Sequence, residues 1–126
     1  MKLSLNLLVL RTTNLEITIS FYQKIGLSFT EEQHGKGPIH YSCQIDNILL
    51  EIYPGTSGNA PERKSAGATL IGFQVDNLDK IVEALSDLEG SILSFPQDSP
   101  WGRRMVIQDP DGRAIELNQS YISSGV

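Results

Sequence analysis

The sequence contains an internal repeat, and this repeat restricts the fold more than any other feature. Residues 7–16, LLVLRTTNLE, align with residues 70–79, LIGFQVDNLD, with leucine, Asn-Leu and an acidic residue at matching places. Further along, NILLEIYP aligns with GRAIELNQ, which makes Glu51 equivalent to Glu116. Internal similarity of this kind indicates duplicated supersecondary units. We therefore expect two modules with the same order of elements.

Two segments have the hydrophobic period of an α-helix, and eight have the character of strands. The helical segments, 15–25 and 78–88, follow Asn14 and Asn77, and asparagine is a favoured N-cap residue. The expected strands are residues 2–11, 28–33, 39–45, 48–53, 69–75, 91–95, 103–108 and 113–118. The order is strand, helix and three strands, and it occurs twice.

This order predicts an α+β fold built from two modules within a single domain of 126 residues. The first module covers about residues 1–54 and the second about residues 69–120. The segment between them, residues 55–68, is rich in Gly, Pro, Ser and Lys and is the expected linker. A single cysteine, Cys43, excludes an intramolecular disulfide, and we expect its side chain to be buried as a small hydrophobic group.

The hairpin predicted over residues 39–53 has one polar and one apolar face. A turn at Asp46-Asn47 pairs Cys43 with Leu50 and Ser42 with Glu51. The polar face then holds His40, Ser42, Glu51 and Tyr53. The apolar face, which we expect to pack on a helix, holds Cys43, Ile45, Leu50 and Ile52.

The last hairpin has the same division. A three-residue loop, Pro110-Asp111-Gly112, with glycine at the left-handed position pairs Val106 with Glu116. A slip of one residue would mix polar and apolar side chains on each face, which favours this register. The polar group is then Arg104, Glu116 and Asn118, and the apolar group is Met105, Ile107, Ile115 and Leu117.

Composition excludes several partners. The net charge of -5 and the pI near 4.9 argue against nucleic acid, which clustered Lys and Arg usually bind. No apolar stretch approaches the roughly 20 residues that span a bilayer, and the N-terminus lacks the features of a secretory signal. We expect a cytoplasmic protein that binds neither nucleic acid nor membrane.

Several motifs resemble one family. The patterns LxVLRTTNLE and FYQKIGL in the first half, with GFQVDNLDKIVEAL, SPWGRR and QDPDGRAIEL in the second, are similar to the vicinal oxygen chelate superfamily. That superfamily includes glyoxalases, bleomycin and fosfomycin resistance proteins, methylmalonyl-CoA epimerases and extradiol dioxygenases. The resemblance covers Leu3 to Asn118 and implies two βαβββ modules in tandem, whose curved sheets form an open cup with the helices outside. It also implies a homodimer.

The resemblance implies a test for a metal. Metal-dependent members offer a ligand from the first and the last strand of each half, and the last-strand positions correspond here to Glu51 and Glu116. The first-strand positions correspond to Leu7 and Leu70, and leucine has no lone pair for a metal. We therefore expect no conventional metal cofactor. An unconventional site of Glu51, His40 and Glu116, or a bulge that turns Asn6 inward, remains as an alternative.

The preferred hypothesis is a glyoxalase/bleomycin-resistance-like protein that binds a small, partly apolar organic ligand in its cup. The expected ligand contacts are Leu7, Arg11, His40, Glu51, Tyr53, Leu70, Trp101, Arg104 and Asn118. One alternative is a metal-dependent lyase or isomerase like lactoylglutathione lyase, or a dioxygenase-like enzyme. Glu116 would then be the catalytic base, with its pKa raised by desolvation. Another alternative gives the two glutamates a structural role, in which Arg104 and His40 neutralise their charges. A further alternative is a dimerising domain with a vestigial site.

Overall fold

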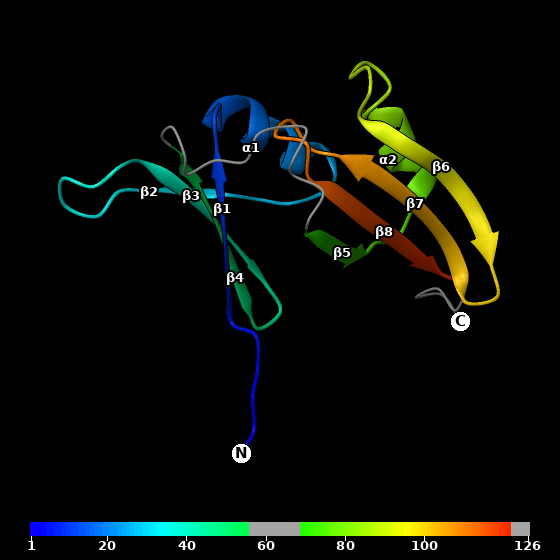
Figure 1. The fold of residues 1–126 in the computed structure, drawn as a ribbon, viewed down its shortest axis with the longest axis horizontal. Helices are drawn as coiled ribbons and strands as arrows, with labels where there is room; N and C mark the ends of the chain where they lie inside the picture. The colour runs from blue at the N-terminus through cyan, green and yellow to red at the C-terminus, as the bar shows by residue number, and fades with distance from the viewer. Residues whose placement is uncertain (56–68, 122–126) are drawn as a thin grey trace. The chain divides into compact units, whose positions relative to one another are not determined.

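The computed structural model describes residues 1–55 and 69–121, and the chain divides into two compact units, Met1–Pro61 and Glu62–Val126. Nearly all of the predicted linker, residues 55–68, lies outside the described residues. The first unit contains β1 (Leu7–Thr12), α1 (Leu15–Lys24), β2 (Thr30–Glu32), β3 (His40–Ile45) and β4 (Ile48–Pro54) (Figure 1). The second contains β5 (Leu70–Gln74), α2 (Leu78–Ala84), β6 (Ile92–Ser99), β7 (Gly102–Gln108) and β8 (Ala114–Ser120). The predicted order of elements is confirmed in both units.

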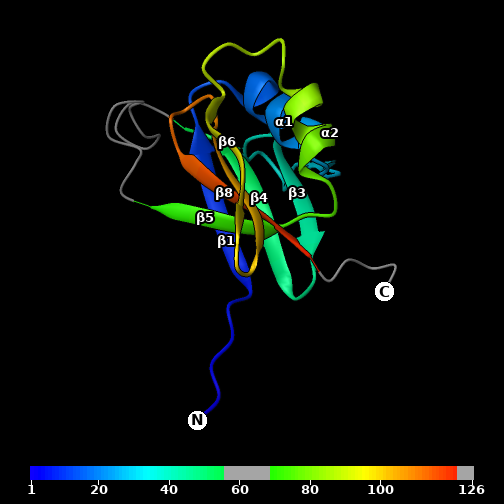
Figure 2. The ribbon, with the colours of Figure 1, turned by 90° about the vertical axis from the view of Figure 1, so that its right-hand side faces the viewer.

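Each unit holds an open four-stranded sheet. In each sheet, the strand that comes last in the unit lies between its first and its third strand. The strand orders are β1-β4-β3-β2 and β5-β8-β7-β6, and the first strand is parallel to the last in each sheet. Figure 1 shows this order in the second sheet, and Figure 2 shows β1, β4 and β3 side by side. The fold is thus α+β with two βαβββ units, as the sequence predicts.

The predicted hairpin registers are confirmed. Cys43 pairs with Leu50 and Ser42 pairs with Glu51 in the first hairpin, whose turn holds Asp46 at a φ of 51°. In the last hairpin, β7 and β8 pair residue by residue as expected. Gly112 has a φ of 94° in its turn, where a side chain would strain the backbone.

One face of each sheet forms the core with the helix of its unit. On β4, Leu50 and Ile52 are buried, and α1 contributes Ile19, Phe21 and Tyr22. The second core contains Met105, Ile107, Ile115 and Leu117 of the sheet with Leu78, Ile81 and Leu85 of the α2 region. Strand alternation therefore sends every second side chain of β4 and β8 to the other face.

Both helices begin where the sequence predicts. The side-chain oxygens of Asn14 and Asn77 accept hydrogen bonds from the N–H groups of Ile17 and Lys80, each at 3.1 Å. Helix α2 ends at Ala84, however, and not at residue 88 as expected. A series of turns replaces its last residues and closes with the Ser91 hydroxyl, which donates to the Leu88 carbonyl at 2.6 Å.

Two strands differ from the prediction by more than two residues at one end. The sequence predicts a first strand that begins at residue 2, but β1 begins at Leu7, which lies opposite Leu49 near the start of β4. Strand β6 continues past Pro96 to Ser99, whereas the predicted strand ends at residue 95. Because β6 is an edge strand with register shifts on either side of Ser94, the missing N–H of proline costs no central ladder bond.

In the described residues, no helix is long and apolar enough to span a membrane. This finding agrees with the absence of a long apolar stretch in the sequence.

The burial pattern predicts unequal costs for two leucine substitutions. Leu117→Ala removes a fully buried side chain of β8 and should lower the free energy of unfolding by about 2–5 kcal/mol. Leu93→Ala, at an exposed position of β6, should change it by less than about 0.5 kcal/mol. Urea unfolding of both variants measures the difference, and equal costs would contradict the assignment of the core.

Candidate functional site

The face of each sheet opposite the core, here called the open face, carries the predicted site residues. Registers and strand alternation define its members. In the first sheet they include Leu7, Val9, Arg11, Glu32, His40, Ser42, Glu51 and Tyr53. In the second sheet they include Leu70, Gly72, Gln74, Arg104, Val106, Glu116 and Asn118.

A row of stacked side chains crosses the first open face. The Tyr53 ring stacks on His40 with centroids 4.1 Å apart and planes 7° apart. On its other side, the guanidinium carbon of Arg11 lies 5.5 Å from the Tyr53 centroid, which is a cation–π arrangement. The structure therefore brings together three residues that the sequence predicted as ligand contacts.

His40 is the most enclosed polar residue of this row, with 1% of its surface exposed. Its Nδ1 lies 3.2 Å from the Pro38 carbonyl oxygen. Its Nε2 lies 3.5 Å from Glu51 Oε2 and 3.9 Å from Glu32 Oε1, and has no hydrogen-bond partner among the described residues. The predicted proximity of His40 to Glu51 is thus present, with an imidazole nitrogen directed at two carboxylates.

In the second sheet, both side-chain oxygens of the equivalent glutamate, Glu116, accept hydrogen bonds. Arg104 Nε donates to Glu116 Oε1, and Asn118 Nδ2 donates to Glu116 Oε2 at 3.2 Å. These three residues are the group that the predicted register placed together. The structural reading, in which Arg104 neutralises Glu116, agrees with this ion pair.

The expectation of a raised pKa at Glu116 is wrong. Hydrogen bonds from Asn118 and then Arg104 favour the ionised form, and with the positive charge of Arg104 they lower the pKa of Glu116 below its ordinary value. Desolvation acts in the opposite direction and is outweighed, because the side chain is only partly buried. A lowered pKa makes Glu116 a weaker proton acceptor than the catalytic-base hypothesis requires.

The side chains beside the two glutamates do not fit the four-ligand metal centre that the resemblance implies. On β1, Val9 lies opposite Glu51, and Leu7 lies two residues away on the same face. On β5, Gly72 lies opposite Glu116, with Leu70 two residues away. Because none of these four first-strand residues has a donor atom in its side chain, the conventional positions of each half offer a single carboxylate.

Trp101 lies in the turn between β6 and β7, and its side chain is exposed. It lines a hollow of about 290 Å³ that Asn118 and Gln74 also line. Gly102 has a φ of 147°, and a Cβ there would lie 2.4 Å from the Gln119 carbonyl oxygen, so glycine is required for this turn to approach β8. Two of the predicted contacts, Trp101 and Asn118, therefore border the same hollow.

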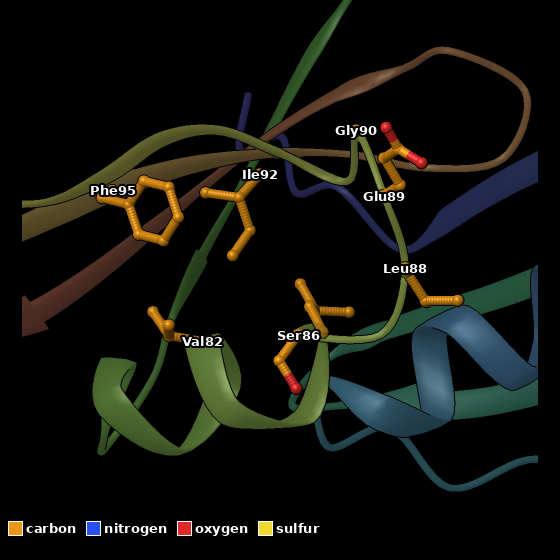
Figure 3. A pocket seen from close by; sticks show the side chains of 8 residues that line it. Val82, Ser86, Leu88, Glu89, Gly90, Ile92 and Phe95 are labelled. Carbon is orange, nitrogen blue, oxygen red and sulfur yellow. The ribbon is translucent and has the colours of Figure 1, made fainter.

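A second hollow, of about 360 Å³, lies between α2 and β6. Figure 3 shows Val82 of α2 across from Ile92 and Phe95 of β6, in a largely apolar lining. None of the predicted site residues borders it.

Two groups of residues escaped sequence reasoning. In the turn before β8, the buried Arg113 pairs with Asp109 at 3.0 Å and with Asp111 at 3.3 Å, which fixes the loop predicted only from Pro110 and Gly112. Near β2, the ring of His34, which is exposed in the connection to β3, lies 5.1 Å from the His40 ring. Alternating acidic residues before an arginine were the available signal for the first group.

Comparison with known proteins agrees with this arrangement. A profile described as Glyoxalase/Bleomycin resistance protein/Dioxygenase superfamily matches residues 4–117. The chain belongs to this superfamily. The resemblance found in the sequence motifs is therefore confirmed, and the two open four-stranded sheets are those of the superfamily fold. A comparison with the curated proteins gives no match.

Solved structures of the superfamily fold are similar to this chain over nearly its whole length. TnmS3, an antibiotic binding protein from Streptomyces sp. CB03234, has a TM-score of 0.70 and 22% identity, with 95% of this chain and 98% of that chain covered. Hypothetical protein SA1046 from S. aureus has a TM-score of 0.73 and 16% identity, over 94% and 95%. The fosfomycin resistance protein FosX from Mesorhizobium loti has a TM-score of 0.63 and 19% identity, over 96% and 93%. At these identities the likeness shows the fold.

The lowered pKa of Glu116 predicts a pH-dependent contribution to stability. Because the ionised carboxylate is favoured in the folded state, it stabilises the fold at pH 7, and this contribution is lost as the pH falls through the lowered pKa. Glu116→Gln should therefore lower the urea midpoint at pH 7, and the difference from wild type should shrink below about pH 4.

Glu83→Gln, at an exposed position of α2, is the control and should have little effect at either pH. A Glu116→Gln effect of the same size at pH 7 and pH 3 would contradict the ion-pair assignment.

Proposed function

We propose that this protein binds a small, partly apolar organic molecule on its open faces, without the conventional metal of the superfamily. The observation that carries the proposal is the mixed character of these faces in both units. Leu7 and Leu70 occupy equivalent positions and are 47% and 56% exposed, on strands next to those that hold Glu51 and Glu116. A strand face that met only water would not require leucine at both positions.

The apolar side chains supply part of the binding energy. Burying a whole leucine or valine side chain contributes roughly 1.5–3 kcal/mol, so covering the exposed parts of Leu7 and Val9 contributes roughly 1–2.5 kcal/mol, and covering that of Leu70 roughly 1–2 kcal/mol. Either contribution alone is less than the roughly 4 kcal/mol that a dissociation constant of about 1 mM requires. Tighter binding therefore needs polar anchors in addition to the apolar contacts.

Arg104 is the best-placed anchor. Its Nε is held by Glu116, which fixes the direction of the guanidinium, and its side chain is half exposed. A guanidinium carries five N–H donors, so it can pair with a carboxylate or phosphate of a ligand while Nε remains bonded. In this arrangement Glu116 positions Arg104 and Asn118 and does not act as a base.

Two further residues suit contacts with a ligand. Tyr53, which is half-buried and stacks on the buried His40, offers an aromatic ring beside Arg11 on the first sheet. On the second sheet, the exposed Trp101 borders the hollow shared with Asn118. An aromatic ring at the edge of such a hollow can cover an organic ligand.

The similar structures support small-molecule binding as the activity. TnmS3 is named as an antibiotic binding protein and FosX as a fosfomycin resistance protein. For this chain, the absence of donor atoms at Leu7, Val9, Leu70 and Gly72 favours binding over metal-assisted lyase or dioxygenase chemistry.

Ligand binding is tested by thermal shift with a panel of glutathione adducts, bleomycin-type glycopeptides and acyl-CoA thioesters. We expect at least one compound to raise the melting temperature and Arg104→Ala to weaken its binding at least tenfold, which equals about 1.4 kcal/mol. Lys80→Ala is the control, because Lys80 is a cation at an exposed position of α2, away from the open face and from the hollow beside Trp101. It should change the affinity less than twofold.

Two outcomes would contradict the proposal. One is a panel in which no compound shifts the melting temperature. The other is a tightly bound divalent metal that is lost in Glu116→Ala, because such a metal would occupy the conventional position.

We also propose that the protein is a cytoplasmic homodimer. Residues 1–6 lie outside any strand, yet Leu3 and Leu5 continue the alternation of Leu7 and are 94% and 66% exposed. This alternation is the reason why the sequence predicts a strand from residue 2. A strand pairing with a second copy would bury both leucines, each worth roughly 1.5–3 kcal/mol.

Sedimentation equilibrium tests the dimer. The double variant Leu3→Ser/Leu5→Ser should raise the dimer dissociation constant at least tenfold, and Leu93→Ser, at an exposed leucine of β6, should leave it unchanged. A wild-type protein that stays monomeric at all concentrations would show this part of the proposal to be wrong.

A further inference from the structure

Both histidines of the chain lie in one cluster. The sequence contains two, His34 and His40, on either side of the turn that joins β2 to β3. Their ring centroids are 5.1 Å apart. With Glu32, at the end of β2, each offers one ligand atom, and these three atoms lie within 4.8 Å of one another. Two imidazoles and a carboxylate at this spacing form a metal-binding set.

The orientation of His40 is the second observation. The Pro38 carbonyl, 3.2 Å from Nδ1, accepts a hydrogen bond only from a protonated Nδ1, which in the neutral ring leaves the lone pair on Nε2. This Nε2 is buried, has no hydrogen-bond partner in the described residues, and is directed at Glu51 and Glu32. A buried lone pair that faces carboxylates is unfavourable unless a proton or a metal cation lies between them.

We propose that Glu32, His34 and His40 bind a divalent transition-metal ion, with Zn²⁺ as the best fit. Neutral imidazole nitrogens favour Zn²⁺ over Mg²⁺ and Ca²⁺, which prefer oxygen ligands. The Pro38 carbonyl has the role of the outer hydrogen-bond acceptor that holds a metal-bound histidine in one tautomer. Glu51, 3.5 Å from the same nitrogen, is placed to be the fourth ligand.

The distances between the proposed ligand atoms are close to those of a tetrahedral zinc site, so small side-chain movements would be enough to bind the ion. Zn–N and Zn–O bonds of about 2.0–2.2 Å in a tetrahedral site place ligand atoms about 3.4 Å apart. The separation between His40 and Glu51 already matches this value, and the separation between His40 and Glu32 is 3.9 Å. His34 is exposed on the turn, so a change of rotamer can bring its nitrogen inward.

This site differs from the metal positions that the superfamily implies. Its three core ligands lie on the β2–β3 hairpin, whereas the conventional positions lie on the first and last strands of both units. It does not involve Glu116, Arg104 or Asn118. The test of ligand binding at Arg104 and the test of zinc binding at His34 can therefore have different outcomes.

Zinc binding is tested with protein purified without a histidine tag, treated with EDTA and dialysed. Titration with ZnCl₂ by calorimetry should give one ion per chain. His34→Ala should weaken binding at least tenfold, because it removes one of the four proposed ligands, and His40→Ala should do the same. Titration with CoCl₂ should give the visible absorption of a four-coordinate ion in wild type and lose it in His34→Ala.

Glu116→Ala is the matched control and should keep wild-type zinc affinity. Because His34 is exposed, the melting temperature of metal-free His34→Ala should equal that of wild type, which separates loss of a ligand from loss of fold. Three results would overturn the proposal: no zinc binding in wild type, unchanged zinc binding in His34→Ala, or loss of zinc in Glu116→Ala with retention in His34→Ala.

Discussion

The parallel pairing of the first strand with the last strand in each unit is the constraint on which the rest of the structure depends. It places β4 and β8 inside their sheets, with a neighbour on either side. A central strand must alternate strictly, since one of its faces is covered by a helix. Leu50 and Ile52, like Ile115 and Leu117, are therefore buried, and Glu51 and Glu116 are held on the other face. The same two strands, β4 and β8, therefore position both the core residues and the candidate site residues.

The two equivalent glutamates have acquired different surroundings. Glu116 has both oxygens bonded, by Arg104 and Asn118, and forms a closed polar group. Glu51 instead faces a buried imidazole whose Nε2 has no hydrogen-bond partner in the described residues. The two equivalent carboxylates thus have different partners: that of Glu116 is held in an ion pair, and that of Glu51 lies beside a buried imidazole nitrogen.

The repeat and the alternation of side chains predicted the order of elements along the chain, the helix starts and both hairpin registers, because these depend on local patterns. What they missed depends on distant parts of the chain. In the sequence, Pro96 indicates the end of a strand. The strand continues through it because β6 is an edge strand, which only the sheet order shows. The lowered pKa of Glu116 depends on hydrogen bonds from Asn118 and Arg104 that outweigh desolvation, and alternation groups these residues without showing that they bond. The approach of His34 to His40 arises from the path of the connection between β2 and β3, for which the sequence has no periodic signal.

The exposed leucines also affect how the protein behaves at high concentration. Leu7 and Leu70 present apolar surface to water, and mutual repulsion from the net charge of -5 limits association through these surfaces at neutral pH. Near the pI of about 4.9 this repulsion vanishes while the apolar surface remains. The colloidal stability of the protein should therefore be lowest in mildly acidic buffer, where phase separation or precipitation would set in while the fold is still intact.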